Sequence, residues 1–162
     1  MKTLILIDIQ KGLTKKALYN KSFFFDTVNR AIKTFRNSGS KIIFVQHNNN
    51  HLKQDTPDWE LDERLDKQPD DIIIQKKHGN AFQETDLKKI LTDPGITSIT
   101  IGGLVSHGCV RATCLGGVAE GFETSLLNHG HTNWKKEAKA LIEKTEKELT
   151  ESGVKMEEVN NL

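Results

Sequence analysis

Both cysteines of this 162-residue chain lie in one glycine-rich stretch, GGLVSHGCVRATCLGG, which covers residues 102–117. An apolar run typical of a strand precedes the stretch and a helical pattern follows it, so we expect Cys109 at the first turn of a helix. Free backbone N–H groups at such a turn favour a thiolate and can lower its pKa from about 8.5. The same N–H groups can hold an oxyanion. Cys109 is therefore a candidate nucleophile.

The second thiol, Cys114, is expected in a different environment. Five positions along a helix rotate a side chain by about 140°, so the two thiols point apart and both should stay reduced. A thiol redox protein is disfavoured for the same reason, and two cysteines four residues apart do not make a zinc ligand set. The apolar stripe that should face the sheet consists of Val110, Cys114, Gly117, Val118 and Gly121.

A nucleophilic thiol needs a proton acceptor and a group that stabilises the resulting charge pair. Asp8 follows the apolar run LILI, where a carboxylate is costly unless it has a partner. Lys76 and Lys77 end another apolar run, and either one alone would be interpreted as a surface charge. Because side chains alternate along a strand, Lys76 shares the face of Ile72 and Ile74. We expect Lys76 to reach the carboxylate and the thiol, and Lys77 to point towards solvent or a loop.

The same glycine-rich stretch has a rival interpretation as a phosphate cradle. Gly103 and Gly108 have the spacing of a P-loop, in which the next two residues should be Lys and then Ser or Thr. Here they are Cys109 and Val110, and the stretch has no G-x-G-x-x-G pattern of a dinucleotide site. A phosphate site is therefore disfavoured.

Apolar strand-like runs alternate with helical patterns along the whole chain. The expected strands are 3–10, 41–46, 71–75, 98–103, 123–128 and a short one at 154–156. Helical patterns precede Gly39, Pro94, Gly121 and Gly153, and the polar stretch 47–70 should be a long loop with one short helix. The alternation predicts a single α/β domain over 1–162, a three-layer α-β-α fold with a mostly parallel, doubly wound sheet of about six strands. Ligands of such sheets bind beyond the carboxyl ends of the strands.

The charge balance of the chain argues against nucleic acid and anionic membranes as partners. Lys and Arg number 23 against 22 Asp and Glu, and a net charge of +1 gives no field that would attract nucleic acid or an anionic membrane. The amino-terminal apolar run is interrupted by Asp8 and is too short for a signal peptide or a membrane span. We expect a soluble, cytoplasmic protein that acts on a small molecule.

Taken together, these segments resemble the isochorismatase-like cysteine hydrolases, which include nicotinamidases and carbamoyl amidohydrolases. The resemblance rests on LILIDIQKG, IIFVQH, DIIIQKKHGNAFQETDL and ITIGGLVSHGCVRAT, and it extends over nearly the whole chain. It implies an Asp-Lys-Cys triad carried by Asp8, Lys76 and Cys109, with the lysine six residues before Phe82. It also implies a cis peptide at Leu104–Val105, an oxyanion hole formed by the N–H groups of Val105 and Cys109, and a homo-oligomer.

Two positions depart from the family pattern. His129 stands where many relatives have Asp, and the Asp-x-His metal cluster of metal-dependent nicotinamidases is missing, since His47 and His51 are four apart without that aspartate. We therefore expect no metal and no cofactor. Candidates for the substrate pocket are Gln10, His47, Trp59, Phe82, Ser106, His131 and Trp134. The expected activity is hydrolysis of a small amide or related C–N bond through a thioester; the alternative is a catalytically silent binding domain of the same fold.

Overall fold

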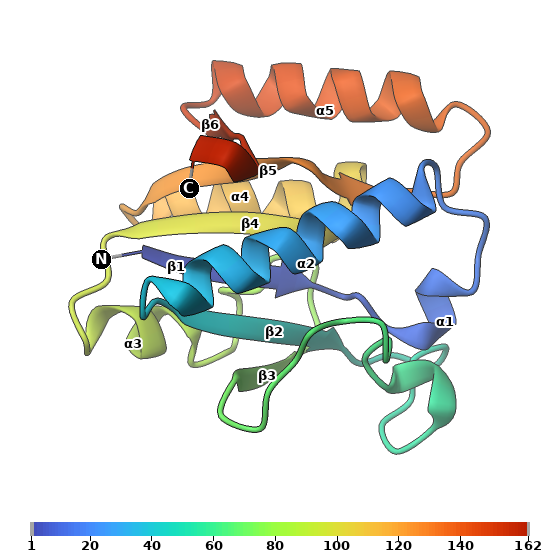
Figure 1. The fold of residues 1–162 in the computed structure, drawn as a ribbon, viewed down its shortest axis with the longest axis horizontal. Helices are drawn as coiled ribbons and strands as arrows, with labels where there is room; N and C mark the ends of the chain where they lie inside the picture. The colour runs from blue at the N-terminus through green and yellow to red at the C-terminus, as the bar shows by residue number, and fades with distance from the viewer. Residues whose placement is uncertain (1, 162) are drawn as a thin grey trace.

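A computed structural model describes residues 2–161, which form one six-stranded sheet with helices on both faces (Figure 1). The strand order is β3-β2-β1-β4-β5-β6 and all neighbours run parallel. The strands are β1 (Lys2–Ile7), β2 (Lys41–His47), β3 (Ile72–Lys76), β4 (Ser98–Leu104), β5 (Glu123–Thr132) and β6 (Lys155–Glu157). The helices are α1 (Lys11–Thr14), α2 (Lys21–Asn37), α3 (Leu87–Thr92), α4 (Arg111–Ala119) and α5 (Ala138–Glu151). The predicted three-layer α/β fold is confirmed.

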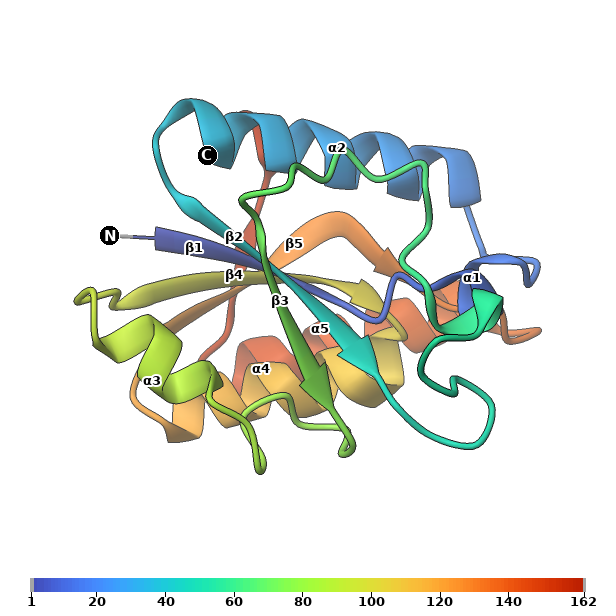
Figure 2. The same ribbon diagram turned by 90° about the horizontal axis from the view of Figure 1, so that it is seen from below.

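Helix α2 covers one face of the sheet, and α3, α4 and α5 cover the other (Figure 2). The central strand β1 serves both sides, because Leu4 and Leu6 pack in the α2 cluster whereas Ile5 and Ile7 pack in the opposite cluster. All four side chains are buried. A strand that is buried on both faces has a continuous run of apolar residues in its sequence. The run LILI therefore predicted a buried strand. Each buried aliphatic side chain contributes about 1.5–3 kcal/mol.

Three short segments complete the chain: the 3-10 helices η1 (Pro57–Trp59) and η3 (Val159–Asn161), and a π-helical turn η2 (Ser106–Val110). Helix η1 is the short helix expected within the long polar loop. Helix α1 was not predicted, because four residues are too few to show a helical period. Within residues 2–161 no helix combines the length and the apolar character that crossing a bilayer requires.

Two expectations about β5 and α4 are wrong. Strand β5 continues to Thr132 rather than ending near residue 128. Its pairing with β4 is irregular between Ile101 and Gly103. The polar sequence NHGHT gives no sign that the strand continues there. Val118 does not face the sheet and is 36% exposed, because α4 instead buries its glycine side. A Cβ at Gly117 would lie 2.7 Å from the side chain of Thr124, so the helix lies too close to the sheet for a larger residue.

The carboxyl ends of β1, β2, β3 and β4 meet at one edge of the sheet, as parallel strands require. The register pairs His47 at the end of β2 with Lys76 at the end of β3. At the end of β4, Gly103 has φ +120°, and a Cβ there would lie 2.1 Å from the carbonyl oxygen of Ile7. Gly103 therefore lets the end of β4 lie close to the end of β1. Asp8 follows β1 and Val105 follows β4, so both come directly after this close contact.

The close approach at Gly103 predicts a large stability difference between two glycines with positive φ. Gly103→Ala should destabilise the fold by about 3 kcal/mol or more, since the added methyl meets fixed backbone. Gly121→Ala should cost about 1–2 kcal/mol, because Gly121 shares the positive φ but has no neighbour within 4 Å. Urea unfolding of both variants tests this, and equal losses would contradict the proposed close approach.

Candidate active site

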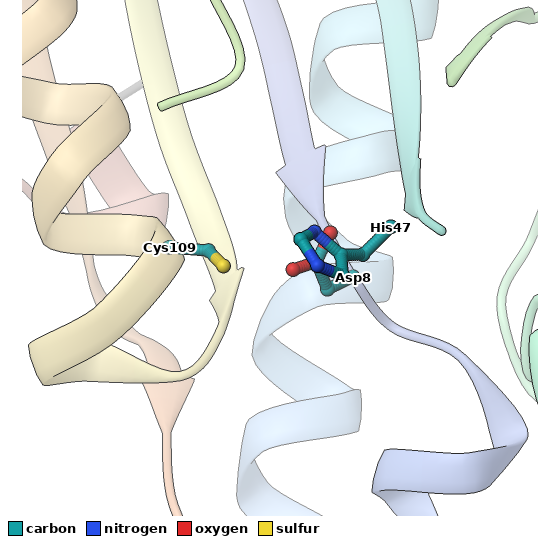
Figure 3. A group of neighbouring side chains, drawn as sticks. All are labelled: Asp8, His47 and Cys109. Carbon is teal, nitrogen blue, oxygen red and sulfur yellow. The ribbon is translucent and has the colours of Figure 1, made fainter. Parts of the chain in front are cut away.

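The cysteine lies on a tight turn that links β4 to α4. A cis peptide joins Leu104 to Val105, as the family resemblance implied. The carbonyl of Val105 then accepts the N–H groups of Gly108 at 3.0 Å and Val110 at 3.3 Å, which closes the π-helical turn η2. Cys109 is partly exposed on this turn, and its sulfur is directed towards Asp8 and His47 (Figure 3).

The side chain of Lys76 is fully buried at the centre of the site. Its Nζ lies 3.1 Å from Asp8 Oδ2, 3.3 Å from Cys109 Sγ and 2.6 Å from His47 Nδ1. A lysine ammonium has three N–H donors, so these three acceptors satisfy it completely. Lys77, the residue after β3, is exposed to solvent. The prediction that Lys76 rather than Lys77 reaches the carboxylate and the thiol is confirmed.

Asp8 directly follows β1 in a left-handed backbone conformation, with φ +54°, and its N–H donates to the carbonyl of Val45 at 2.9 Å. One carboxylate oxygen, Oδ2, accepts from Lys76, whereas Oδ1 is buried without a hydrogen-bond partner. Burial raises the pKa of Asp8 above its usual range, and the positive charge of Lys76 acts in the opposite direction. The carboxylate therefore has one fixed oxygen and one oxygen free to accept a proton.

The expectation of a lowered thiol pKa at Cys109 is wrong. Burial and then the negative charge of Asp8 raise its pKa to about 11, and the opposing charge of Lys76 does not compensate. At neutral pH Cys109 is thus a thiol beside the side chain of Asp8. The other thiol, Cys114, is fully buried in the core as predicted, and burial raises its pKa to about 12.

His47 stays neutral at physiological pH. Burial, followed by the charge of Lys76, lowers its pKa to about 4. Because its Nδ1 accepts from Lys76, the ring proton lies on Nε2. His47 therefore offers an N–H donor to a molecule that enters the site.

Asp8, His47 and Cys109 have the donor atoms of a metal site, since one ligand atom from each lies within 4.8 Å of the other two. The ammonium of Lys76, however, lies within hydrogen-bond distance of all three residues. A positive charge in that position takes the place of a cation and repels another one. These residues do not fit a metal ion.

The remaining pocket candidates occupy different places. Gln10 is buried and its amide bridges two segments: Nε2 donates to the carbonyl oxygens of His47 and Trp59, and Oε1 accepts the His47 N–H. Gln10 and Trp59 thus hold the long loop against the end of β2. Trp134 packs against the α2-side core, with the Lys16 ammonium 4.8 Å from its ring centre.

Three further candidates are buried. Phe82 stacks on Phe122 in the core, with ring centres 5.7 Å apart. Ser106 and His131 hydrogen-bond to each other, and His131 also contacts Glu146 of α5. Sequence reasoning missed Glu146, because the helix around it is rich in Glu and Lys and nothing there distinguishes one carboxylate. His129 is exposed on β5 and packs on Phe23.

The sequence is similar to those of known hydrolases. Streptothricin hydrolase from Streptomyces noursei is 23% identical over 139 residues, which are 83% of this chain and 55% of that protein. The chain thus spans about half the length of that relative. N-carbamoylsarcosine amidase from Arthrobacter sp. is 32% identical over 63 residues, 39% of this chain and 24% of that protein.

The fold also matches solved structures. The zinc complex of pyrazinamidase from Pyrococcus horikoshii superposes with a TM-score of 0.86 at 27% identity, covering 97% of this chain and 98% of that one. The family model described as the isochorismatase domain matches residues 2–147. The chain therefore belongs to the isochorismatase family of hydrolases.

Proposed function

We propose that this protein hydrolyses a small-molecule amide or related C–N bond through a thioester on Cys109. The observation that carries the proposal is the buried ammonium of Lys76, which contacts both the thiol and the carboxylate of Asp8, whose second oxygen has no partner. That set supplies a nucleophile, a base and a cation at one point. The amide-cleaving activities named for pyrazinamidase and N-carbamoylsarcosine amidase support the choice of bond.

The acylation half of the reaction begins with a neutral thiol. Asp8 takes the proton from Cys109 as the sulfur attacks the substrate carbonyl, so that an S–C bond forms and the carbonyl oxygen becomes an oxyanion. The backbone N–H groups of Val105 and Cys109 hold that oxyanion. When the tetrahedral intermediate collapses, Asp8 gives its proton to the leaving nitrogen and the C–N bond breaks.

The deacylation half reverses these roles. Asp8 takes a proton from water as the water oxygen attacks the thioester, the C–S bond breaks, and the sulfur of Cys109 recovers its proton from Asp8. Lys76 stays bound to both partners and stabilises whichever one is negative. His47 donates its Nε2–H to a polar atom of the substrate and so contributes to specificity.

A catalytically silent binding domain is the competing interpretation. A binding domain has no need of a buried carboxylate oxygen that lacks a hydrogen-bond partner, yet Asp8 Oδ1 is such an oxygen. Such a group is costly in a binding domain and useful in an enzyme. No metal is assigned to the mechanism, because Lys76 occupies the position that a cation would need. We also propose that the protein forms a homo-oligomer, as the family resemblance implies.

Cys109→Ala should abolish hydrolysis and Cys114→Ala should not. The first variant loses the nucleophile, whereas the second removes a buried sulfur and costs about 1–2 kcal/mol of stability. Ammonia release from a panel of small amides, ureas and carbamoyl compounds measures activity, and mass spectrometry of the trapped protein should place the acyl group on Cys109. Full activity in Cys109→Ala would refute the thioester route.

Asp8→Asn should slow hydrolysis and yet speed alkylation of Cys109. The carboxylate charge raises the thiol pKa, so its removal lowers that pKa and increases the thiolate fraction at a given pH. In the wild type, with a pKa of about 11, the rate of reaction with iodoacetamide should rise about tenfold per pH unit and continue rising past about pH 9. A plateau near neutral pH, or slower alkylation of Asp8→Asn, would contradict the assigned origin of the shift.

Lys76→Met should lose turnover, and Lys77→Met should keep it. Methionine retains the apolar stem but removes the cation, so the thiol pKa rises further and both hydrolysis and alkylation slow. Loss of one partner of a buried pair also costs about 3–5 kcal/mol, so rates are compared at a temperature where both variants are folded. Inactivity of Lys77→Met with a normal Lys76→Met would require a different register for β3.

A further inference from the structure

We propose that His131 is a positioning residue for the nucleophile turn. It holds Ser106, which lies between Val105 and Cys109, and it ties that turn to α5 through Glu146. The inference rests on the proposed hydrolysis and extends it to residues outside the Asp-Lys-Cys set. None of the three residues of this chain of hydrogen bonds belongs to the triad.

The geometry joins three elements in one line. Ser106 Oγ in η2 lies 2.7 Å from His131 Nδ1 in β5, and His131 Nε2 lies 3.1 Å from Glu146 Oε1 in α5. The side chain of His131 and the whole of Ser106 are inaccessible to solvent, and the side chain of Glu146 is 25% exposed. The turn η2 packs directly against both β5 and α5.

The carboxylate of Glu146 fixes the direction of its hydrogen bond with His131. A carboxylate only accepts, so the Nε2 of His131 carries a proton and donates it to Glu146. The other ring nitrogen, Nδ1, shares a hydrogen bond with the hydroxyl of Ser106, which can act as donor or acceptor. Removal of the imidazole would leave the buried hydroxyl of Ser106 without its partner.

The nucleophile turn needs such an anchor. The hydrogen bonds from Gly108 and Val110 to the Val105 carbonyl close the turn on itself, but they do not fix its position relative to the sheet. The side chain of Ser106 provides that link from the middle of the turn. Displacement of about 1 Å can cost a factor of about 100 in rate when two N–H groups must meet one oxyanion.

A serine, a histidine and a glutamate in a line also suggest a second nucleophilic site. Ser106 has no accessible surface, so no carbonyl can reach its hydroxyl. A nucleophile has to be exposed to its substrate, and the partly exposed Cys109 on the same turn meets that condition. The line therefore positions the turn rather than attacking a substrate.

A cavity of about 260 Å³ adjoins His131, whose own side chain stays inaccessible to solvent. The cavity lies between the start of α2, β5 and α5, and it is also lined by Tyr19, Phe23, His129, Ile142 and Glu146. His131→Ala would extend this cavity up to Ser106. Imidazole added to the solution could then enter the space and hydrogen-bond to the Ser106 hydroxyl again.

Two reagents distinguish an effect on the position of the nucleophile turn from an effect on the reactivity of the Cys109 thiol. Acylation of Cys109 by p-nitrophenyl acetate forms an oxyanion, whereas alkylation by iodoacetamide displaces iodide at a saturated carbon and forms none. Both adducts are quantified by mass spectrometry against a Cys109→Ala background. His131→Ala should slow acylation about 10-fold to 100-fold and change alkylation by less than about twofold. Added imidazole should restore acylation in this variant and leave the wild type unchanged.

Matched variants complete the test. His129→Asn changes a histidine of the same strand and cavity that makes no contact with Ser106, and it tolerates the positive φ of +63°, so both rates should stay at wild-type values. Glu146→Ala should slow acylation several-fold, and Glu146→Gln, which keeps an acceptor oxygen, should restore it. These two variants lie on the partly exposed side of α5 and report on the line even if His131→Ala unfolds.

The possible outcomes distinguish this inference from the proposed function. Wild-type acylation rates in His131→Ala and Glu146→Ala would overturn the positioning role. So would a parallel loss of acylation and alkylation that imidazole does not restore, because a general loss of structure affects both reagents. A wild-type protein that is alkylated at Cys109 but never acylated there would overturn the proposed hydrolysis itself, and the positioning role with it.

Discussion

The buried ammonium of Lys76 is the interaction on which the site depends. Moving such a charge out of water costs several kcal/mol, and the fold compensates it with acceptors from three other parts of the chain. These are the carboxylate that follows β1, the imidazole at the end of β2 and the thiol on the turn after β4. Each acceptor is available only because parallel strands deliver their carboxyl ends to one edge of the sheet. The catalytic geometry is thus a direct result of strand order.

Few groups in this site carry a charge at neutral pH. Besides the ion pair of Lys76 with Asp8, the resting site holds a neutral imidazole and a protonated thiol. The same burial that keeps the sulfur protonated also strengthens its attraction to Lys76 once it becomes negative. In the proposed reaction the proton passes from Cys109 to the neighbouring carboxylate of Asp8, so no separate thiolate has to be stored.

The fold, and the meeting of Asp8, Lys76 and Cys109 at one edge of the sheet, could be predicted from the sequence, because apolar runs mark the strands whose carboxyl ends carry these residues. Alternating apolar runs specify a doubly wound sheet, and the two-residue period of β3 distinguishes Lys76 from Lys77. The direction of the Cys109 pKa shift could not be predicted in this way, since burial by residues distant in sequence outweighs the local helix terminus. The continuation of β5 was hidden by an irregular register, and Val118 was misplaced because glycines rather than apolar side chains form the buried side of α4.

The sequence also does not distinguish pocket residues from core residues. Aromatic residues such as Phe82 are as common in cores as in binding sites, and only the observed stacking on Phe122 places this one in the core. Glu146 carries no signal in its sequence context, and its role depends on where α5 packs. The protonated state of Cys109 has one more consequence, for the survival of the protein under oxidising conditions. Peroxides react with thiolates much faster than with thiols. Because the raised pKa of Cys109 keeps it a thiol at neutral pH, it is protected from irreversible oxidation.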